Sequence, residues 1–489
     1  MLAVVFAASV LAISPASVTA AIVSSTPAQT FLAIGGSGAW WPNHAFNFPE
    51  AVRQNISTLL FSQSGLGLSS YRFNVGGGGV GVATPAHAPQ TFYVSPGVYN
   101  FSADPQGMYF LQAAAAHGVP SFTAFVNSAP PGLTSNGASC GGSFVSGTGE
   151  AFGEYLADVV AHLRSLNINV DFVSPMNEPD DAFGTPGTCT QEGMQVAADQ
   201  RAEVINGVFN ALENRGLSTS VGILADEAWS GSLATSELPT WLPSVEDKVA
   251  AIAHHIYDFP SDASYASFVD SVKSVAPGKA TWMSDICCSL GTGTGTGRGY
   301  TQGFDPTIDN ALMFSGIMFQ SLVLANEPVY DFWTLVSASI GCSPLNDATC
   351  FTPNSVGWND GLIYLDPDYA TNNNFNLYIA KHFWTFKHFG NFIKPGSVRM
   401  PLEGPDVRQW MMAVSTPSTY NVILMNPNTT DSTLTLSFPD TVCPVSAFRT
   451  SGTEDFATVA KANKVPAGAF LLPLKSMSLT TYTFDRAAC

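Results

Sequence analysis

The segment VDFVSPMNEP at positions 170–179 contains the strongest indication of the fold. Its first part, VDFVS, is rich in β-branched and aromatic residues, and an amide, an acid and a proline follow where a buried strand would end. Short apolar runs of the same kind recur before and after it, and longer segments with helical periodicity lie between them. This alternation is typical of βα units that build a parallel sheet.

Eight such runs occur, which is the number of strands in a closed (β/α)8 barrel. They are Phe31–Ala39, Leu68–Val75, Ser121–Asn127, Val170–Met176, Ser220–Asp226, Ile252–Tyr257, Lys279–Ile286 and Val329–Leu335. Helices are predicted at Phe152–Leu166, Gln191–Arg215 and Ile308–Leu324. Gly216 is the expected C-cap of the second helix. We therefore predict an α/β fold, a (β/α)8 TIM barrel, over residues 31–371.

After about Asn372 the pattern changes to short alternating segments separated by turn residues. These segments are Tyr420–Met425, Ser432–Phe438, Ala469–Pro473 and Ser478–Phe484. Several short strands with turn signals between them indicate a sandwich. We predict an attached all-β sandwich side domain over residues 372–489.

The first twenty residues, MLAVVFAASVLAISPASVTA, are apolar and then small, as in a signal peptide with cleavage after Ala20. No Lys or Arg precedes the apolar run, so a buried strand or a membrane anchor is the alternative. Ser14 and Pro15 interrupt the run before it reaches the ~20 apolar residues of a membrane span. We expect a signal peptide at residues 1–20 and a secreted protein that does not span a membrane.

Eight cysteines and three sequons fit an oxidising, extracellular compartment. The pairs suggested by position are Cys140–Cys189, Cys342–Cys350 and Cys443–Cys489, which leaves Cys287 and Cys288 either to bond with each other or to bond elsewhere. The sequons begin at Asn55, Asn100 and Asn428, so a glycoprotein is expected. Because the net charge is -18, a nucleic-acid partner is not expected, whereas a polysaccharide or oligosaccharide is compatible with it. We expect a monomer.

Polar and aromatic residues recur where the predicted barrel strands end. Functional side chains of such barrels lie at these C-terminal strand ends. The ends carry Arg72 and Asn74, Asn127, Asn177 and Glu178, Asp226 and Glu227, His255 and Tyr257, Asp285, and Trp333. A barrel with a purely structural role would have little reason for this pattern.

Glu178 and Asp285 are the predicted catalytic pair. Hydrolysis of a glycosidic bond needs one protonated carboxyl group and one ionised carboxyl group on opposite sides of the bond. Glu178 follows an amide and precedes a rigid proline, and Asp285 ends a strand about three βα units later. Taken alone, Asp285 would be interpreted as a cap or turn residue, whereas for Glu178 a solvated side chain beside a capping Asn177 is only the alternative.

Other strand-end residues are predicted to bind substrate. Arg72 could keep a carboxylate ionised, although an Arg in a structural ion pair is the alternative. His255 and Tyr257 share one strand face, although His255 could also be a packed core residue. Asn127 and Asn177 could bind sugar hydroxyl groups, and the tryptophans could stack on sugar rings or belong to the core: Trp40, Trp41, Trp229 and Trp333.

Three other site types are not supported by the sequence. No metal site is predicted, because His254 and His255 face opposite ways on a strand and no His-Glu-x-x-His pattern occurs. A serine hydrolase would need a Gly-x-Ser-x-Gly elbow, which is absent. The glycines at 76–79 lack the Lys and Ser/Thr that follow them in a phosphate-binding loop. No cofactor is expected.

Together these motifs resemble glycoside hydrolase family 30. The resemblance lies in RFNVGG at 72–77, MNEP at 176–179, HIY at 255–257, WMSD at 282–285 and FGNFIKPGSVR at 389–399, and it covers nearly all of the chain after the leader. It implies a retaining mechanism with Glu178 as acid/base, and an N-terminal strand, residues 21–30, that joins the β-sandwich. The motifs are most similar to those of fungal endo-β-1,6-galactanases, with β-1,6-glucan or xylan as the alternative substrate.

The chain departs from the family pattern at Asp285, where the family has Glu. Aspartate is one methylene shorter, which withdraws the carboxylate by about 1.5 Å, one carbon–carbon bond. Asp226, Glu227 or Glu327 could in principle substitute, although they lie on less suitable strands. A catalytically impaired carbohydrate-binding homologue is therefore the second alternative.

Overall fold

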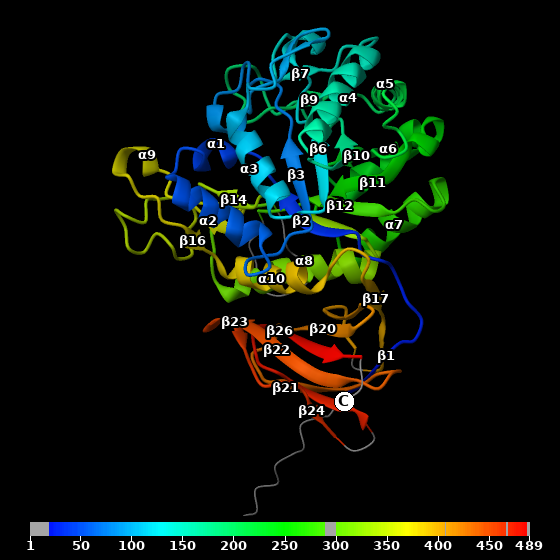
Figure 1. Cartoon of the computed structure of the whole chain (residues 1–489), viewed down its shortest axis with the longest axis vertical. Coiled ribbons are helices and arrows are strands. Elements are labelled where there is room, and N and C mark those ends of the chain that lie inside the picture. Colours follow the sequence, from blue (N-terminus) through cyan, green and yellow to red (C-terminus); the bar gives the residue numbers. More distant parts are fainter. Residues whose placement is uncertain (1–18, 289–299, 406, 466–467, 487–489) are drawn as a thin grey trace, which may run out of the picture.

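The computed structural model describes residues 19–288, 300–405, 407–465 and 468–486. The predicted signal peptide lies outside the described residues except for Thr19 and Ala20. Figure 1 shows a barrel of strands and helices above a smaller all-β part. The predicted fold class, a TIM barrel with an attached β-sandwich, is confirmed.

The eight predicted strands form a closed barrel in which every neighbouring pair is parallel. Around the barrel the order is β2, β3, β6, β8, β10, β11, β12 and β13, and then β2 again. Their bounds are β2 Ala33–Ser37, β3 Ser70–Asn74, β6 Ser121–Phe125, β8 Val170–Ser174, β10 Gly222–Ala228, β11 Val249–His255, β12 Thr281–Asp285 and β13 Val329–Phe332. Because all strands run the same way, their C-terminal ends meet at one rim.

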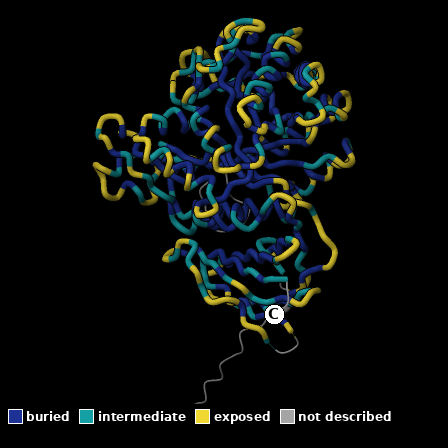
Figure 2. The backbone as a smooth tube through the Cα atoms, viewed as in Figure 1, coloured by how far each residue is buried: buried dark blue, intermediate teal, exposed yellow. Residues whose placement is uncertain are grey.

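Helices cover the outside of the barrel because each presents one apolar face to it. In α4 the buried residues Phe152, Leu156, Val159 and Leu163 recur every three or four positions. The covering helices are α2 Glu50–Phe61, α3 Pro105–Ala116, α4 Gly149–Ser165, α5 Arg201–Asn214, α6 Gly231–Trp241, α7 Asp262–Val275, α8 Ile308–Phe319 and α10 Lys381–Phe392. Figure 2 shows the buried residues inside this ring and the exposed ones mostly in the outer loops.

One predicted helix begins ten residues too early. The sequence predicted a helix from Gln191, whereas α5 begins at Arg201. Residues Met194–Gln195 instead form β9, which pairs with β7, Gly142–Ser143, and Val196 N–H donates to the carbonyl of Pro179 at 2.8 Å. Tertiary pairing with a neighbouring loop therefore overrides the local helical pattern.

Helix α8 continues into a π-helix, η5 Gln320–Ala325. Residues Ile308–Ala325 are long and apolar enough to cross a membrane by length and composition, and 78% of this window is buried inside the fold.

The remaining strands of the C-terminal part form two sheets that face each other. One has the order β18-β1-β21-β25-β24 and the other β17-β19-β20-β26-β22-β23. Their bounds are β1 Thr19–Val23, β17 Val398–Met400, β18 Leu402–Glu403, β19 Met411–Ser415, β20 Thr419–Asn426, β21 Ser432–Ser437, β22 Cys443–Ser451, β23 Glu454–Thr458, β24 Asn463–Lys464, β25 Phe470–Leu474 and β26 Ser478–Asp485. Their apolar side chains form a separate core that includes Leu434, Leu472 and Phe484.

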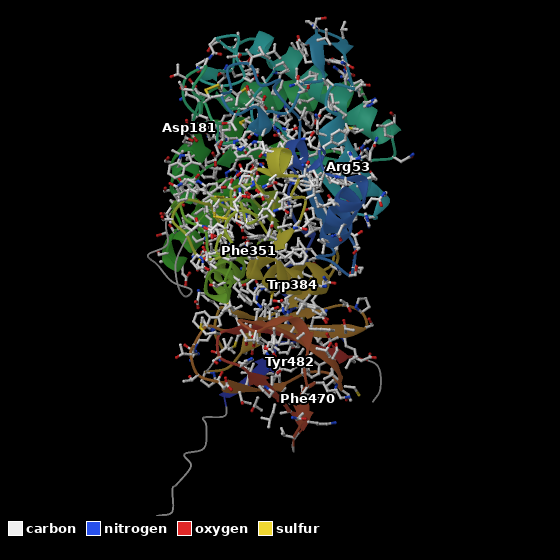
Figure 3. The ribbon with its side chains drawn as sticks, turned by 90° about the vertical axis from the view of Figure 1, so that its left-hand side faces the viewer. Arg53, Asp181, Phe351, Trp384, Phe470 and Tyr482 are labelled. Atoms are coloured by element: carbon white, nitrogen blue, oxygen red, sulfur yellow. A yellow bond between two sulfur atoms is a disulfide. The ribbon has the colours of Figure 1, made fainter. Side chains whose placement is uncertain are left out.

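Two segments join the barrel to the sandwich. Strand β1, the first described element, lies between β18 and β21, and the chain then returns to the barrel. Helix α10 packs against α8 on one side and against β22, β23 and β26 on the other. In Figure 3, Trp384 of α10 lies at the level where the barrel meets the sandwich, and Phe470 and Tyr482 lie within the sandwich.

Short elements in the loops complete the fold. They are α1 Pro42–Ala45, η1 Pro85–His87, β4 Tyr93–Ser95, β5 Val98–Tyr99, η2 Pro131–Leu133, η3 Leu242–Ser244, η4 Glu246–Lys248, β14 Val336–Ser337, β15 Ile363–Tyr364, α9 Tyr369–Asn372 and β16 Tyr378–Ile379. Within the described residues, disulfides join Cys140 to Cys189 and Cys342 to Cys350, as the sequence suggested. Cys287 and Cys288, for which the sequence left two possibilities open, bond with each other. Cys489, the predicted partner of Cys443, lies outside the described residues.

Candidate active site

A cavity of about 730 Å³ lies at the rim where the barrel strands end. Both predicted catalytic carboxyl groups line it, Glu178 after β8 and Asp285 at the end of β12. Its aromatic wall consists of Trp40, Phe183, Trp229, Tyr257, Tyr300, Trp333 and Trp358. Its volume is that of a site for a small ligand or a few sugar units.

Glu178 has the environment of a proton donor. Its backbone φ of 45° is left-handed, and its N–H donates to the carbonyl of Glu227 at 3.0 Å, which fixes the turn after β8. The side chain is 14% exposed, and Oε1 lies 2.8 Å from Nδ1 of His255. Burial raises the pKa of Glu178, and the hydrogen bond and charge of His255 only partly offset this effect.

Asp285 has the environment of an ionised carboxylate. Nη1 of Arg72 donates to its Oδ2 at 2.8 Å, and the hydroxyl of Tyr257 donates to its Oδ1 at 2.6 Å. The side chain is only 3% exposed, so the ion pair with Arg72 is poorly screened by solvent. Both oxygens therefore have a donor despite the shorter side chain.

A buried layer beneath the cavity connects these two carboxyl groups. Nε2 of His255 lies 3.1 Å from Oε2 of Glu227, and Nη2 of Arg72 lies 3.2 Å from Oε1 of the same Glu227. Arg72 also donates to Oδ1 of Asn177 at 3.0 Å. The carboxylate of Glu227 thus contacts both cations of the site. These are His255, which contacts Glu178, and Arg72, which contacts Asp285.

The charges of this layer have identifiable causes. Burial would raise the pKa of Glu227, but the guanidinium of Arg72 and the imidazole of His255 hold it well below its usual range. Burial would likewise lower the pKa of His255, but the surrounding carboxyl groups, that of Asp285 foremost, raise it to about 10. Near neutral pH the layer contains two cations and an anion.

The carboxyl groups that could have replaced Asp285 are buried away from the cavity. Glu227 is enclosed by its cation partners and by the hydroxyls of Ser174, at 2.6 Å, and Ser284. Asp226 is ion-paired with Arg201 of α5. Oε1 of Glu327 lies 2.6 Å from Nε2 of His254, on the opposite strand face from His255.

Arg201 supports the site from behind. Besides Asp226 it binds Asp180 at 2.6 Å and Glu237 at 2.8 Å, and its own side chain is fully buried. Asp180 lies two residues after Glu178, so this cluster connects the turn after β8 with strand β10 and helix α6.

The predicted substrate-binding residues occupy two different layers. Asn177, Tyr257 and Trp333 line the cavity. Arg72 and His255 lie beneath it and contact the catalytic carboxyl groups. Asn127 is also beneath it, where its Nδ2 donates to Oδ1 of Asn74 at 3.3 Å.

The four tryptophans predicted to stack on sugars or to belong to the core are divided between the cavity and the core. Trp40, Trp229 and Trp333 line the cavity. Trp40 stacks on His87, with ring centroids 4.0 Å apart, and packs edge-on against Trp333. Trp41 is a core residue, 2% exposed, and its Nε1 donates to the carbonyl of Ser37.

Several lining residues were not identified from the sequence. They come from the loops that follow the strands: His87, Phe183, Cys287, Cys288, Tyr300, Ser339, Trp358 and Asp360. None belongs to a recognisable motif, although the adjacent cysteines at the end of β12 were a usable signal.

The glycines at 76–79 have an internal partner. The carboxylate of Glu192 accepts hydrogen bonds from the N–H groups of Gly77, at 3.0 Å, and Gly79, at 2.8 Å. Gly78 and Gly79 have φ values of 99° and 70°, which few other residues adopt. The carboxyl group of Glu192, whose pKa burial raises to about 8, therefore holds this loop in place. Among the described residues, no group of three or more His, Cys, Asp or Glu could hold a metal ion.

Comparisons with known proteins agree with this geometry. Residues 17–240 match the model of the family described as O-Glycosyl hydrolase family 30. The chain is 23% identical over 376 residues to an exo-beta-1,6-galactobiohydrolase of Bifidobacterium longum subsp. longum, which covers 60% of this chain and 24% of that protein. It is 25% identical over 238 residues to an endo-beta-1,6-galactanase of Hypocrea rufa, which covers 41% of this chain and 48% of that protein. The matches thus span about a quarter and about half of these relatives.

Among solved structures, the catalytic domain of GH30 xylanase C from Talaromyces cellulolyticus has the same fold. The TM-score is 0.69 at 21% identity, with coverage of 95% of this chain and 99% of that chain.

Proposed function

The chain is a glycosidase of family 30, as its motifs predicted, and on that premise we propose that it is a secreted hydrolase of β-1,6-linked galactan. In this proposal Glu178 is the acid/base and Asp285 the nucleophile of a retaining mechanism. The observation that carries the assignment is the pair of carboxyl environments in one cavity. Burial raises the pKa of Glu178, whereas Arg72 and Tyr257 donate to both oxygens of Asp285.

In the first step Asp285 attacks the anomeric carbon and Glu178 transfers its proton to the glycosidic oxygen. The bond between the anomeric carbon and that oxygen breaks, and an ester to Asp285 forms. The proton loss leaves a carboxylate on Glu178 beside the His255 cation, at 2.8 Å, which stabilises the new charge.

In the second step a water molecule attacks the same carbon, and Glu178 takes its proton. The ester bond breaks, Asp285 regains its charge, and Arg72 and Tyr257 again donate to it. Since the carbon is inverted twice, the product keeps the β configuration.

The choice of galactan rests on the two curated relatives, both named for action on β-1,6-linked galactose. An aromatic wall, and the absence of Lys and Arg among the described residues that line the site, suit a neutral sugar chain. The side chains of arabinogalactan are such chains.

A panel of polymers tests the proposal. The purified protein is incubated with β-1,6-galactan from de-arabinosylated arabinogalactan, with β-1,6-glucan and with xylan, and proton NMR follows the first anomer released. We expect galacto-oligosaccharides with the β anomer first. Products from glucan or xylan alone would reassign the substrate, and an α anomer first would show inversion. Binding without turnover would identify a carbohydrate-binding homologue.

A further inference from the structure

Asp360 is a cavity-lining carboxyl group that the proposed reaction does not use. It lies in the long loop after β13, directly after Trp358 and Asn359. Its Oδ1 is buried and forms no hydrogen bond of ordinary geometry with the described residues, although the hydroxyls of Ser337 and Ser339 are near enough to lower its pKa somewhat. The carboxyl group thus retains capacity to accept hydrogen bonds.

The backbone around Asp360 is held from two sides. Its carbonyl accepts a hydrogen bond from the N–H of Thr334, at 2.5 Å, at the end of strand β13. The carbonyl of Asn359 accepts one from the N–H of Cys288, at 3.3 Å. Asp360 is therefore fixed relative to both β12 and β13, so its position is set before substrate binds.

The order of strands around the barrel places Asp360 on the glycone side. Glu178 follows β8, and the leaving group must lie next to this proton donor. Strand β13, to which Asp360 is bound, is the fourth strand from β8 in either direction around the ring of eight. Asp360 is therefore held by the strand opposite the one that precedes Glu178, and in the proposed reaction this is the side of the sugar whose anomeric carbon is attacked.

The charges that the described residues bring to the cavity lining are negative. Its ionisable lining includes Glu178, Asp181, Asp285 and Asp360, and no Lys or Arg among the described residues lines it. Burial lowers the pKa of His87 to about 4, so it is neutral at pH 7, and burial raises the pKa of Asp360 to about 6, so it is ionised there. The cations Arg72 and His255 are already paired beneath the cavity.

We propose that Asp360 determines specificity: its carboxylate accepts hydrogen bonds from hydroxyl groups of a neutral glycone sugar and excludes glycone sugars that carry a carboxylate. A hydroxyl group can donate to Asp360, whereas a uronic acid would place a like charge beside it in a poorly solvated site. The inference deepens the proposed function and rests on it. It assigns the enzyme to neutral glycone sugars and not to uronates.

The test uses two substrates that differ only in charge. One is an aryl β-galacturonide, and the other is the aryl β-galactoside that results when its carboxyl group is reduced to an alcohol, so the charge lies on the sugar whose anomeric carbon is attacked. We expect kcat/KM of the wild type to favour the neutral substrate by at least about 10-fold. In Asp360→Asn we expect this ratio to fall to about threefold or less, and KM for the neutral substrate to rise by about 10-fold.

Asp181→Asn is the matched control. It removes one charge from another lining residue, but Asp181 is exposed to solvent, so its charge is screened. We expect the ratio to change by less than about twofold, whatever the effect on rate. A ratio that is unchanged in Asp360→Asn, or that falls equally in both variants, would overturn the inference.

A measurement on the wild type alone keeps the inference testable if the variant does not fold. Galactose should inhibit hydrolysis at a concentration at least about fivefold lower than galacturonate does. Equal inhibition would overturn the inference while leaving the galactanase assignment intact. A wild type that fails to cleave neutral β-1,6-galacto-oligosaccharides would instead contradict the proposed function.

Discussion

At the residue scale, the proposed catalysis depends on the imidazole of His255, which contacts two carboxyl groups. His255 contacts Glu178 through Nδ1 and Glu227 through Nε2, so its ring has no other position to adopt. The surrounding carboxyl groups, that of Asp285 foremost and then those of Glu178 and Glu227, keep His255 charged, and the charged ring limits how far burial raises the pKa of Glu178. Glu227 does not line the cavity, so it acts on the proposed proton donor only through His255.

Replacement of the proton donor tests its role directly. We expect Glu178→Gln to lower kcat on β-1,6-galactan by about 10³-fold, because an amide cannot protonate the leaving oxygen. An aryl galactoside with a good leaving group needs no proton, so its first-step rate should fall far less. Pre-steady-state release of the aryl group measures this step. An equal loss on both substrates would argue against Glu178 as the acid.

The charge of His255 should be visible in the pH profile. A proton donor works only below its own pKa, so the basic limb of kcat/KM follows Glu178. Since His255 lowers that pKa, His255→Gln should move the basic limb to higher pH, although an amide donor remains. The profile of His87→Gln, which changes a histidine that does not contact Glu178, should keep its limb in place. If the basic limb of kcat/KM does not move in His255→Gln, His255 does not lower the pKa of Glu178.

The residue scale is also where sequence reasoning was most and least successful. The presence of Glu178, Asp285, Tyr257 and Trp333 in the cavity lining could be predicted, because barrel topology brings strand ends together whatever the loops do. Trp40 and Trp41 are adjacent, and only the packing of Trp41 in the core decides which of them faces the cavity. Asp360 lies in a loop, where no periodicity relates a residue to the site.

At the scale of elements, strand β12 is followed by a disulfide between adjacent cysteines. Asp285 is followed after one residue by the disulfide-linked pair Cys287 and Cys288, and both cysteines line the cavity. Cys287 Sγ lies 3.8 Å from the hydroxyl of Tyr257, the same group that donates to Asp285. The cross-link therefore fixes the chain just beyond Asp285, the proposed nucleophile.

Two double substitutions of cysteine should affect different properties, one the kinetics and the other the stability. Replacing Cys287 and Cys288 by Ser should lower kcat/KM by about 10-fold, because small displacements of reacting groups are costly, with little change in stability. Replacing Cys140 and Cys189 by Ser opens a link between residues 49 apart and should cost about 4 kcal/mol of unfolding free energy with little change in kcat/KM. Urea unfolding and steady-state kinetics measure both. Equal kinetic effects would show that the adjacent pair has no special role.

The element that the sequence misplaced shows why local patterns fail near a site. Residues 191–200 were predicted to be helical, but Glu192 is required by the glycine loop and Met194 by strand pairing with β7. Such long-range partners are invisible in a periodicity of 3.6 residues. The barrel strands were predictable because most residues along each run are buried.

For the whole molecule, the contact between barrel and sandwich contains a buried histidine. His388 of α10 lies 2.7 Å from Oγ1 of Thr481 in β26 through Nδ1, and 3.1 Å from Oγ1 of Thr450 in β22 through Nε2. It is fully buried, and burial, together with the charge of Lys387, lowers its pKa to about 3. The contact therefore requires a neutral ring.

This requirement predicts acid sensitivity with a definite sign. Below the ordinary histidine pKa of about 6.5 the unfolded chain binds a proton that folded His388 cannot, so stability falls as the pH falls from about 6.5 towards 3. His388→Gln should be less stable than the wild type at pH 7. Over this pH window, however, its unfolding free energy should decline by about 1 kcal/mol less per pH unit than that of the wild type, because the variant has no imidazole to protonate on unfolding. The carboxyl groups are common to both proteins, so their contribution cancels in the comparison. Urea unfolding at a series of pH values measures the slopes. The exposed His117→Gln should follow the wild-type slope, and parallel curves for His388→Gln and wild type would show that His388 is protonated without cost.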